Sequence, residues 1–205
     1  MSKEIRAFNF EVRAEENEEH GHFLTGQPIV YDERTDLGWY DEIIDDGALT
    51  DADLKDVRFL VNHNTDMIPL ARSRNNNTNS TMQLEIVPGK GMAIRVDLDV
   101  ENNADSRSLW SAVGRGDISG MSFMFTVDKD AWEEVDSEHP TRHIRSISKV
   151  FEVSAVTFPA YAQTSIQQRG LSETLDSAME SLESERKRLM EIERRKQKIR
   201  IMSEV

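Results

Sequence analysis

The feature that most constrains the fold is a change of hydrophobic period close to Gly170. Before this residue, apolar and polar residues alternate in short runs typical of β-strands, and turn signals rich in glycine and proline separate the runs. After it, apolar residues recur at the heptad spacing of an amphipathic helix. We therefore expect a mainly β domain with few helices over residues 1–169, followed by a helical tail over residues 170–205.

Eight runs in the first part carry the strand pattern, and one segment is typical of a helix. The helix is expected over Asn103–Val113, where Asn103 or Asp105 can cap its start. The sequence Pro88-Gly89-Lys90-Gly91 is a strong turn signal, so the two runs on either side of it should form a hairpin. An acidic, turn-prone stretch is expected over Asp128–Pro140. The strand-like runs are Ile5–Val12, Phe23–Tyr31, Arg58–Asn62, Met82–Val87, Met92–Val100, Ile118–Val127, Arg142–Ile147 and Val150–Phe158.

The tail has an imperfect heptad seam, because two of its eight core positions are charged. Such a helix suits packing on a partner or weak dimerisation better than a long stable coiled coil. Packing on the body of the same chain is an equally good interpretation of the pattern. The eight positions are Leu175, Leu182, Leu189 and Lys196 in one row and Ala178, Glu185, Ile192 and Ile199 in the other.

Composition excludes several classes of function. The chain has no cysteine, which excludes disulfides, thiolate metal sites and cysteine nucleophiles. Its formal net charge is -13, and residues 171–205 hold equal numbers of acidic and basic side chains, so the excess lies in the first part. An acidic surface of this kind disfavours nucleic-acid binding. No apolar run approaches membrane-spanning length, and we expect a soluble, intracellular protein without a membrane partner.

Three strand-like stretches place a polar, reactive residue among apolar ones: His63, Ser122 and Glu152. A buried polar group must find a partner, and a serine nucleophile needs a base that is itself oriented by an acceptor. These residues are therefore candidates for a hydrolase site. Each also has an ordinary structural interpretation, as a packed histidine, a solvent-facing serine and an outward-facing strand glutamate. The remaining histidines show no ligand-like spacing with the scattered carboxylates, so no metal or other cofactor is expected.

In their order along the chain, six landmarks resemble the prohead proteases of HK97-like tailed bacteriophages, over most of residues 5–168. Each landmark is weakly specific alone, and together they are specific. The landmarks are residues Gly26 to Asp32, Ile43 to Ala48, Val61 to Asn64 followed by Pro69 to Arg72, Gly91 before a strand, Asp117 to Phe125, and Phe151 to Tyr161.

The resemblance implies a closed or partly open β-barrel of the herpesvirus-protease type, plus the amphipathic helix. It implies a serine endopeptidase in which Ser122 is the nucleophile and His63 the general base. In herpesvirus enzymes a second histidine takes the third place, whereas the phage pattern favours Glu152. Backbone N–H groups or Arg72 are the candidates for stabilising the oxyanion.

The resemblance also implies where the enzyme acts and on what. The substrates would be the scaffolding part of the major capsid protein and the chain itself, inside the assembling prohead in the host cytoplasm. The tail is a candidate for delivery into the head and for self-association. The main alternative is a non-enzymatic capsid scaffold or assembly protein, and a second is a metal-dependent hydrolase. A dependence of cleavage on Ser122, and insensitivity to chelators, would separate these classes.

Overall fold

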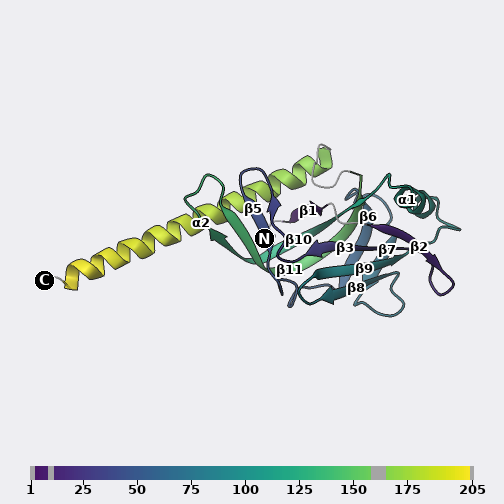
Figure 1. The fold of residues 1–205 in the computed structure, drawn as a ribbon, viewed down its shortest axis with the longest axis horizontal. Helices are drawn as coiled ribbons and strands as arrows, with labels where there is room; N and C mark the ends of the chain where they lie inside the picture. Colours follow the sequence, from purple (N-terminus) through teal and green to yellow (C-terminus); the bar gives the residue numbers. More distant parts are fainter. Residues whose placement is uncertain (1–2, 9–11, 158–164, 204–205) are drawn as a thin grey trace.

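The chain folds into two β-sheets over a shared core, with a short helix at one end and a long helix that leaves the body at the other (Figure 1). The computed structural model describes residues 3–8, 12–157 and 165–203. The expectation of a mainly β fold with few helices and a carboxyl-terminal helix is confirmed in these residues.

The larger sheet has seven strands arranged around β11. This strand pairs with β10 in antiparallel fashion along one side. Its other side pairs in parallel with β5 near the start of β11 and with β6 near its end. β1 lies at the edge of the sheet, antiparallel to β10. The strands are β1 (Glu4–Phe8), β4 (Thr35–Asp36), β5 (Asp41–Ile44), β6 (Asp56–Val61), β7 (Ala71–Arg74), β10 (Gly120–Glu133) and β11 (Thr141–Val156).

The smaller sheet has the strand order β2-β3-β9-β8. Its last two strands form the hairpin predicted from the turn signal. Gly91 begins β9 with a φ of 120°, and a Cβ atom there would lie 2.0 Å from the carbonyl oxygen of Ile29. Only glycine fits this close approach. The strands are β2 (Arg13–Asn17), β3 (Gly21–Val30), β8 (Met82–Val87) and β9 (Gly91–Asp97).

Helix α1 (Ala104–Gly114) confirms the helix expected between the strands. Of the two candidate caps, Asn103 is the one used, because its side chain accepts hydrogen bonds from the backbone N–H groups of Asp105 and Ser106. Leu109 and Val113 lie on one face of the helix and join the buried core between the sheets.

The two longest strands exceed the sequence prediction. β10 was expected to end near Val127, yet it continues to Glu133 into the stretch expected to form turns. Two separate strands were expected within 142–158, yet β11 is continuous. The physical reason is that β10 and β11 pair with each other along their whole length. Their pairing contains several register shifts, and such bulges let a long pair of strands bend without ending.

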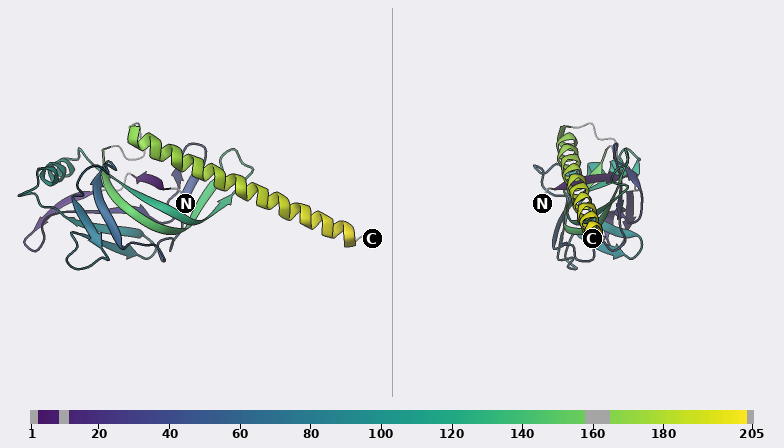
Figure 2. Two further views of the ribbon diagram at one scale, coloured as in Figure 1. Left: turned by 180° about the vertical axis from the view of Figure 1, so that it is seen from behind. Right: turned by 90° about the vertical axis from the view of Figure 1, so that its left-hand side faces the viewer.

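Helix α2 (Ser165–Ser203) begins before the predicted boundary at Gly170. Ala178 and Leu182 are buried in a second apolar cluster with Tyr40 and Trp132 of the body. Arg186, one turn further on, donates to the Val135 carbonyl at 2.7 Å, and beyond it the helix projects away from the sheets, as Figure 1 and the left view of Figure 2 show. Packing on the body therefore accounts for the apolar residues around Ala178 and Leu182, but not for the apolar residues near the carboxyl end of the helix.

Strand pairing among the described residues forms two separate sheets, so the barrel implied by the resemblance stays a prediction. No described helix combines the length and the hydropathy needed to cross a membrane.

Candidate active site

Three neighbouring strands bring the sequence candidates to one level of the larger sheet. Ser122 on β10 lies opposite Ser154 on β11, and Ser154 lies beside Leu60 on β6. β6 ends at Val61, so His63 follows directly on the adjoining turn. Residues that are distant along the chain thus share one row across the sheet.

The side chains of Ser122, His63 and Glu152 form a continuous hydrogen-bonded chain, named here the Ser–His–Glu cluster. The Nε2 atom of His63 lies 2.6 Å from Ser122 Oγ, and its Nδ1 atom lies 2.5 Å from Glu152 Oε1. With Glu152 ionised, Nδ1 carries the proton that it donates to the carboxylate, and Nε2 is left to accept the serine proton. This is the arrangement by which a histidine activates a serine hydroxyl.

The turn that carries His63 holds an unusual backbone. Asn62 and His63 have φ values of 51° and 56°, in the left-handed region that non-glycine residues seldom adopt. The Asn62 side chain makes a reciprocal pair of hydrogen bonds with Thr157, at 2.9 and 3.1 Å. A strained turn persists when its surroundings over-determine it, and these bonds hold the turn that carries His63.

Ser154 is a fourth polar residue of the cluster that the sequence reasoning did not single out. Its hydroxyl donates to Glu152 Oε2 at 2.6 Å and accepts from the backbone N–H of His63 at 3.1 Å. It therefore orients the carboxylate and the histidine backbone together. The signal that could have found it is the spacing, because residues two apart on a strand face the same side of the sheet.

The Ser–His–Glu cluster is closed to solvent in this structure. The exposed fractions of Ser122, His63 and Glu152 are 0%, 1% and 3%. Ser122 Oγ also donates to the backbone carbonyl of Arg6, on β1, at 2.6 Å. The serine hydroxyl thus has two acceptors within hydrogen-bond distance.

Arg72, the candidate oxyanion residue, is engaged elsewhere. It lies on β7, two strands from β11 through β6, and its guanidinium donates twice to Asp56, at 2.6 and 2.9 Å. These bonds raise the pKa of Arg72. The structure therefore brings His63, Ser122 and Glu152 together and leaves Arg72 partly exposed in an ion pair of its own.

One group of three metal-ligand types occurs in the described ranges, Asp36, Asp41 and His139, away from the cluster. Asp41 already accepts hydrogen bonds from His139 at 3.0 Å and Arg34 at 2.7 Å. The first of these is the main cause that lowers the pKa of Asp41. The Arg34 guanidinium in contact with the Asp41 carboxylate balances its negative charge without a metal ion.

A pocket of about 680 Å³ opens beside the histidine turn. Asn62 and Asn64, the two sequence neighbours of His63, form part of its wall. Its other lining is largely apolar and comes from α1 and the segments around it, including Val61, Met67, Leu109, Ala112 and Ile118.

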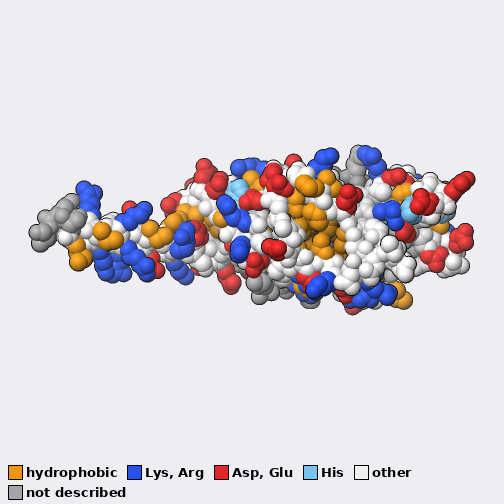
Figure 3. All heavy atoms as spheres, turned by 90° about the horizontal axis from the view of Figure 1, so that it is seen from below, with side chains coloured by type: hydrophobic (Ala, Val, Ile, Leu, Met, Phe, Trp, Pro, Cys, Tyr) orange, Lys and Arg blue, Asp and Glu red, His pale blue; other side chains and the backbone are white. Residues whose placement is uncertain are grey.

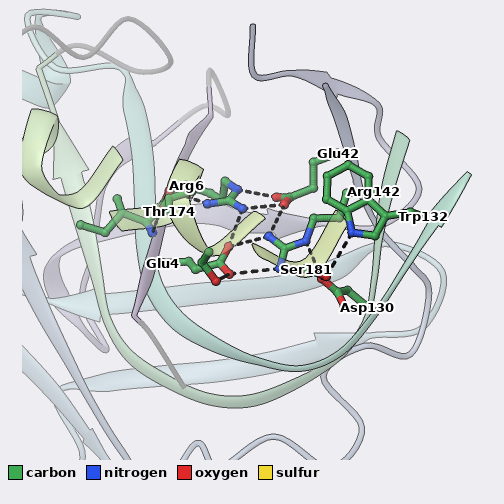
Figure 4. A network of polar contacts seen from close by, with 10 residues as sticks. Glu4, Arg6, Glu42, Asp130, Trp132, Arg142, Thr174 and Ser181 are labelled. Carbon is green, nitrogen blue, oxygen red and sulfur yellow. Dashed lines mark hydrogen bonds and ion pairs between the residues drawn. The ribbon is translucent and has the colours of Figure 1, made fainter. Parts of the chain in front are cut away.

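A second buried polar cluster, named here the ion network, lies on β1, β5 and β11 next to α2 (Figure 4). Arg6 donates to Glu42 and to Glu4, the latter at 2.7 Å, and Arg142 donates to both of the same carboxylates, at 2.9 Å to Glu4 and 3.3 Å to Glu42. All four side chains are buried. Arg142 also donates to Asp130 at 2.7 Å.

The guanidinium groups of the ion network favour the ionised form of the Glu4 carboxyl. Burial raises the pKa of the Glu4 carboxyl, but the nearby Arg6 and Arg142 guanidinium groups outweigh burial, so the net pKa of Glu4 is lowered. Burial raises the pKa of the neighbouring Tyr40 hydroxyl to about 12. The tyrosine therefore stays neutral beside the network.

Comparison with known protein families supplies the class of protein. The sequence model of the family described as Caudovirus prohead serine protease matches residues 8–177. The chain belongs to this family. It is therefore a phage prohead serine protease that takes part in capsid maturation, and it acts inside the prohead in the host cell. Neither the curated proteins nor the solved structures that were searched gave a match.

Proposed function

We propose that this prohead protease cleaves the scaffolding part of the major capsid protein, and the chain itself, with Ser122 as nucleophile, His63 as general base and Glu152 as the third member. The observation that carries the proposal is the unbroken hydrogen-bonded chain from Ser122 Oγ through the imidazole to Glu152. A metal-dependent hydrolase and a purely structural assembly factor give no reason for such a chain.

In the proposed mechanism Ser122 Oγ attacks a substrate carbonyl carbon while its proton passes to His63 Nε2. Glu152 accepts from Nδ1–H, which keeps the reactive tautomer and stabilises the imidazolium that forms. The imidazolium then protonates the leaving amine, and water releases the acyl group from Ser122 with His63 again as base. Because Arg72 is held by Asp56, backbone N–H groups are proposed as the oxyanion donors.

The pocket next to the histidine turn is proposed to accept a substrate side chain. Apolar groups of Leu109, Ala112 and Ile118 line it, and Asp105 lies at its wall. A pocket that combines an apolar lining with placed polar groups is a usual form of a ligand site. We expect an apolar residue of the substrate to enter it.

The test is co-expression with the cognate capsid protein, followed by intact-mass measurement of both chains. The wild-type enzyme should shorten the capsid protein and itself, and Ser122→Ala should do neither. Ser73→Ala is a matched control, because Ser73 is a buried strand serine whose hydroxyl has no hydrogen-bond partner in the described residues. Cleavage at the wild-type rate by Ser122→Ala would overturn the assignment.

The projecting end of α2 is proposed to deliver the enzyme into the head. Within residues 187–200, named here the distal segment, seven side chains are basic and two are acidic. Figure 3 shows basic and hydrophobic side chains gathered along this end. Met190 and Ile199 are exposed there. The basic residues are Lys187, Arg188, Arg194, Arg195, Lys196, Lys198 and Arg200.

These features favour an acidic amphipathic helix of the capsid scaffold as the partner. Two distal segments side by side in parallel would place like charges together, which disfavours self-association in that arrangement. Deleting residues 187–205 leaves the docked turns around Ala178 and Leu182, and the bond from Arg186 to the Val135 carbonyl, in place. The shortened enzyme should cleave capsid protein in solution and fail to enter heads. Unchanged packaging would contradict the delivery role, and a loss of dimers on deletion would favour self-association.

A further inference from the structure

The hydrogen of the Ser122 hydroxyl has two competing acceptors. His63 Nε2 and the Arg6 carbonyl oxygen each lie 2.6 Å from Ser122 Oγ. A serine hydroxyl carries one hydrogen, so it can donate to only one of them at a time. Nucleophilic attack requires the donation to His63. A Ser122 hydroxyl that donates to the Arg6 carbonyl is therefore not activated for attack.

The competing carbonyl belongs to the edge strand β1. Ala7 lies opposite Ser122 in the β1–β10 register, and Ile5 lies opposite Met124. β1 is thus an extended backbone segment that lies beside Ser122 and pairs with β10, the strand that carries Ser122. An extended peptide substrate that adds to a sheet edge takes this kind of position.

β1 does not lie in a reactive position. Ser122 Oγ is hydrogen-bonded to the oxygen of the Arg6 carbonyl, whereas attack requires Oγ to approach the carbonyl carbon along a near-attack path. Together with the complete burial of Ser122, this geometry closes the site without offering the strand for cleavage.

We propose that β1 is an autoinhibitory strand, and that the substrate chain binds along the β10 edge in its place once β1 has moved away. This inference rests on the proposed role of Ser122 and adds how the same site is regulated and where its substrate docks.

The contacts of β1 identify what holds it. Glu4 and Arg6 are its two members of the ion network (Figure 4). Helix α2 adds two further bonds, since Thr174 Oγ1 accepts from the Ile5 N–H at 3.2 Å and Ser177 Oγ donates to Glu4 Oε1 at 3.2 Å. The tail helix therefore clamps the strand that covers the nucleophile.

The charges divide in a way that permits release. β1 takes away one cation and one anion, Arg6 and Glu4, which pair with each other. Glu42 and Arg142 remain behind and also contact each other. No buried charge loses every partner, which avoids the main penalty of breaking a buried ion pair.

The experiment locks β1 on β10 reversibly. The native chain has no cysteine, so the double variant Ile5→Cys/Met124→Cys contains one pair of thiols, directly opposite each other in the register. The oxidised and reduced forms are treated with a fluorophosphonate probe, and labelling of Ser122 is followed by intact mass. Thermal unfolding of both forms checks that each is folded. The pair Glu85→Cys/Ala93→Cys, between β8 and β9, is the matched control disulfide.

We expect the oxidised lock to be labelled at least about tenfold more slowly than its reduced form, with no such difference in the control pair. Equal rates in the two redox states of the lock would overturn the autoinhibitory role of β1. Capsid cleavage at the wild-type rate by Ser122→Ala would instead contradict the proposed nucleophile, and the strand proposal would fall with it.

Discussion

The Ser–His–Glu cluster and the ion network are both buried, both use β11, and meet at β1, yet they differ in the groups that fill them. The first joins a neutral hydroxyl, an imidazole and one carboxylate in a line. The second joins two guanidinium groups and two carboxylates in a closed set, in which each cation contacts both anions.

The difference separates a site that can react from one that holds structure together. The linear cluster ends in the Ser122 hydroxyl, which has a proton that it can donate to His63. In the closed set each carboxylate contacts two guanidinium groups, and guanidinium groups do not lose their protons in proteins. Changes in the cluster should therefore alter rate, and changes in the network should alter stability.

The largest effect is expected for Glu152→Gln, which removes the charge next to Nδ1 and keeps the shape. The imidazole loses the negative charge that fixes its tautomer and stabilises the imidazolium, and the amide NH2 can face Nδ1 instead, so the cleavage rate should fall by about 10³- to 10⁴-fold with little change in unfolding. Capsid cleavage followed by mass measures the rate, with the exposed strand residue change Glu85→Gln as control. A near-normal rate would favour another residue as the third member.

The next largest effect is expected for Arg142→Met, which leaves Glu4 and Glu42 with one guanidinium between them. Breaking a buried ion pair from one side costs about 3–5 kcal/mol, so the free energy of unfolding should drop by that amount. The control is Arg115→Met, which breaks an exposed pair with Asp117 and should cost at most about 1 kcal/mol. Urea denaturation measures both. Similar losses in the two variants would mean that the ion network is not a structural unit.

A smaller effect is expected for Ser154→Ala, which removes one hydrogen bond from Glu152 and one from the His63 backbone. Losing such bonds costs about 1–3 kcal/mol, and we expect the turnover rate to fall about tenfold or more while the Michaelis constant changes little. Ser73→Ala should leave the turnover rate unchanged. A rise in the Michaelis constant alone would show that Ser154 shapes substrate binding and does not position the histidine.

The smallest effect is the acid dependence of the ion network. Burial raises the pKa of Glu4, but its two arginine neighbours lower the pKa by more than burial raises it. The net pKa of Glu4 therefore lies below its ordinary value of 4.5. A carboxylate of this kind stabilises the fold above its unfolded-state pKa, and the benefit is lost as pH falls through the folded-state pKa. The stability difference between wild type and Glu4→Gln should thus shrink below about pH 4.5. A constant difference from pH 7 to pH 3 would contradict this.

The residues of the Ser–His–Glu cluster could be selected as candidates from the sequence because each lies in a short local pattern. His63 follows a strand-like run, and Ser122 and Glu152 interrupt apolar runs. Such patterns reflect nearest-neighbour geometry, which is also why the β8–β9 hairpin and α1 were predicted correctly. The extended β10 and β11 were missed, because their length depends on pairing with each other.

The sequence by itself therefore determined the class of fold, the helical tail and the candidate reactive residues, all of which depend on local periodicity and side-chain chemistry. Only the tertiary structure decided that Glu4 and Arg6 are buried against Glu42 and Arg142, that the Arg6 carbonyl contacts Ser122, and that α2 docks on the body through residues between Thr174 and Arg186. Charged residues on a strand look solvent-exposed in a sequence. Their burial becomes favourable only when partners from 36 to 138 residues away in the chain neutralise them.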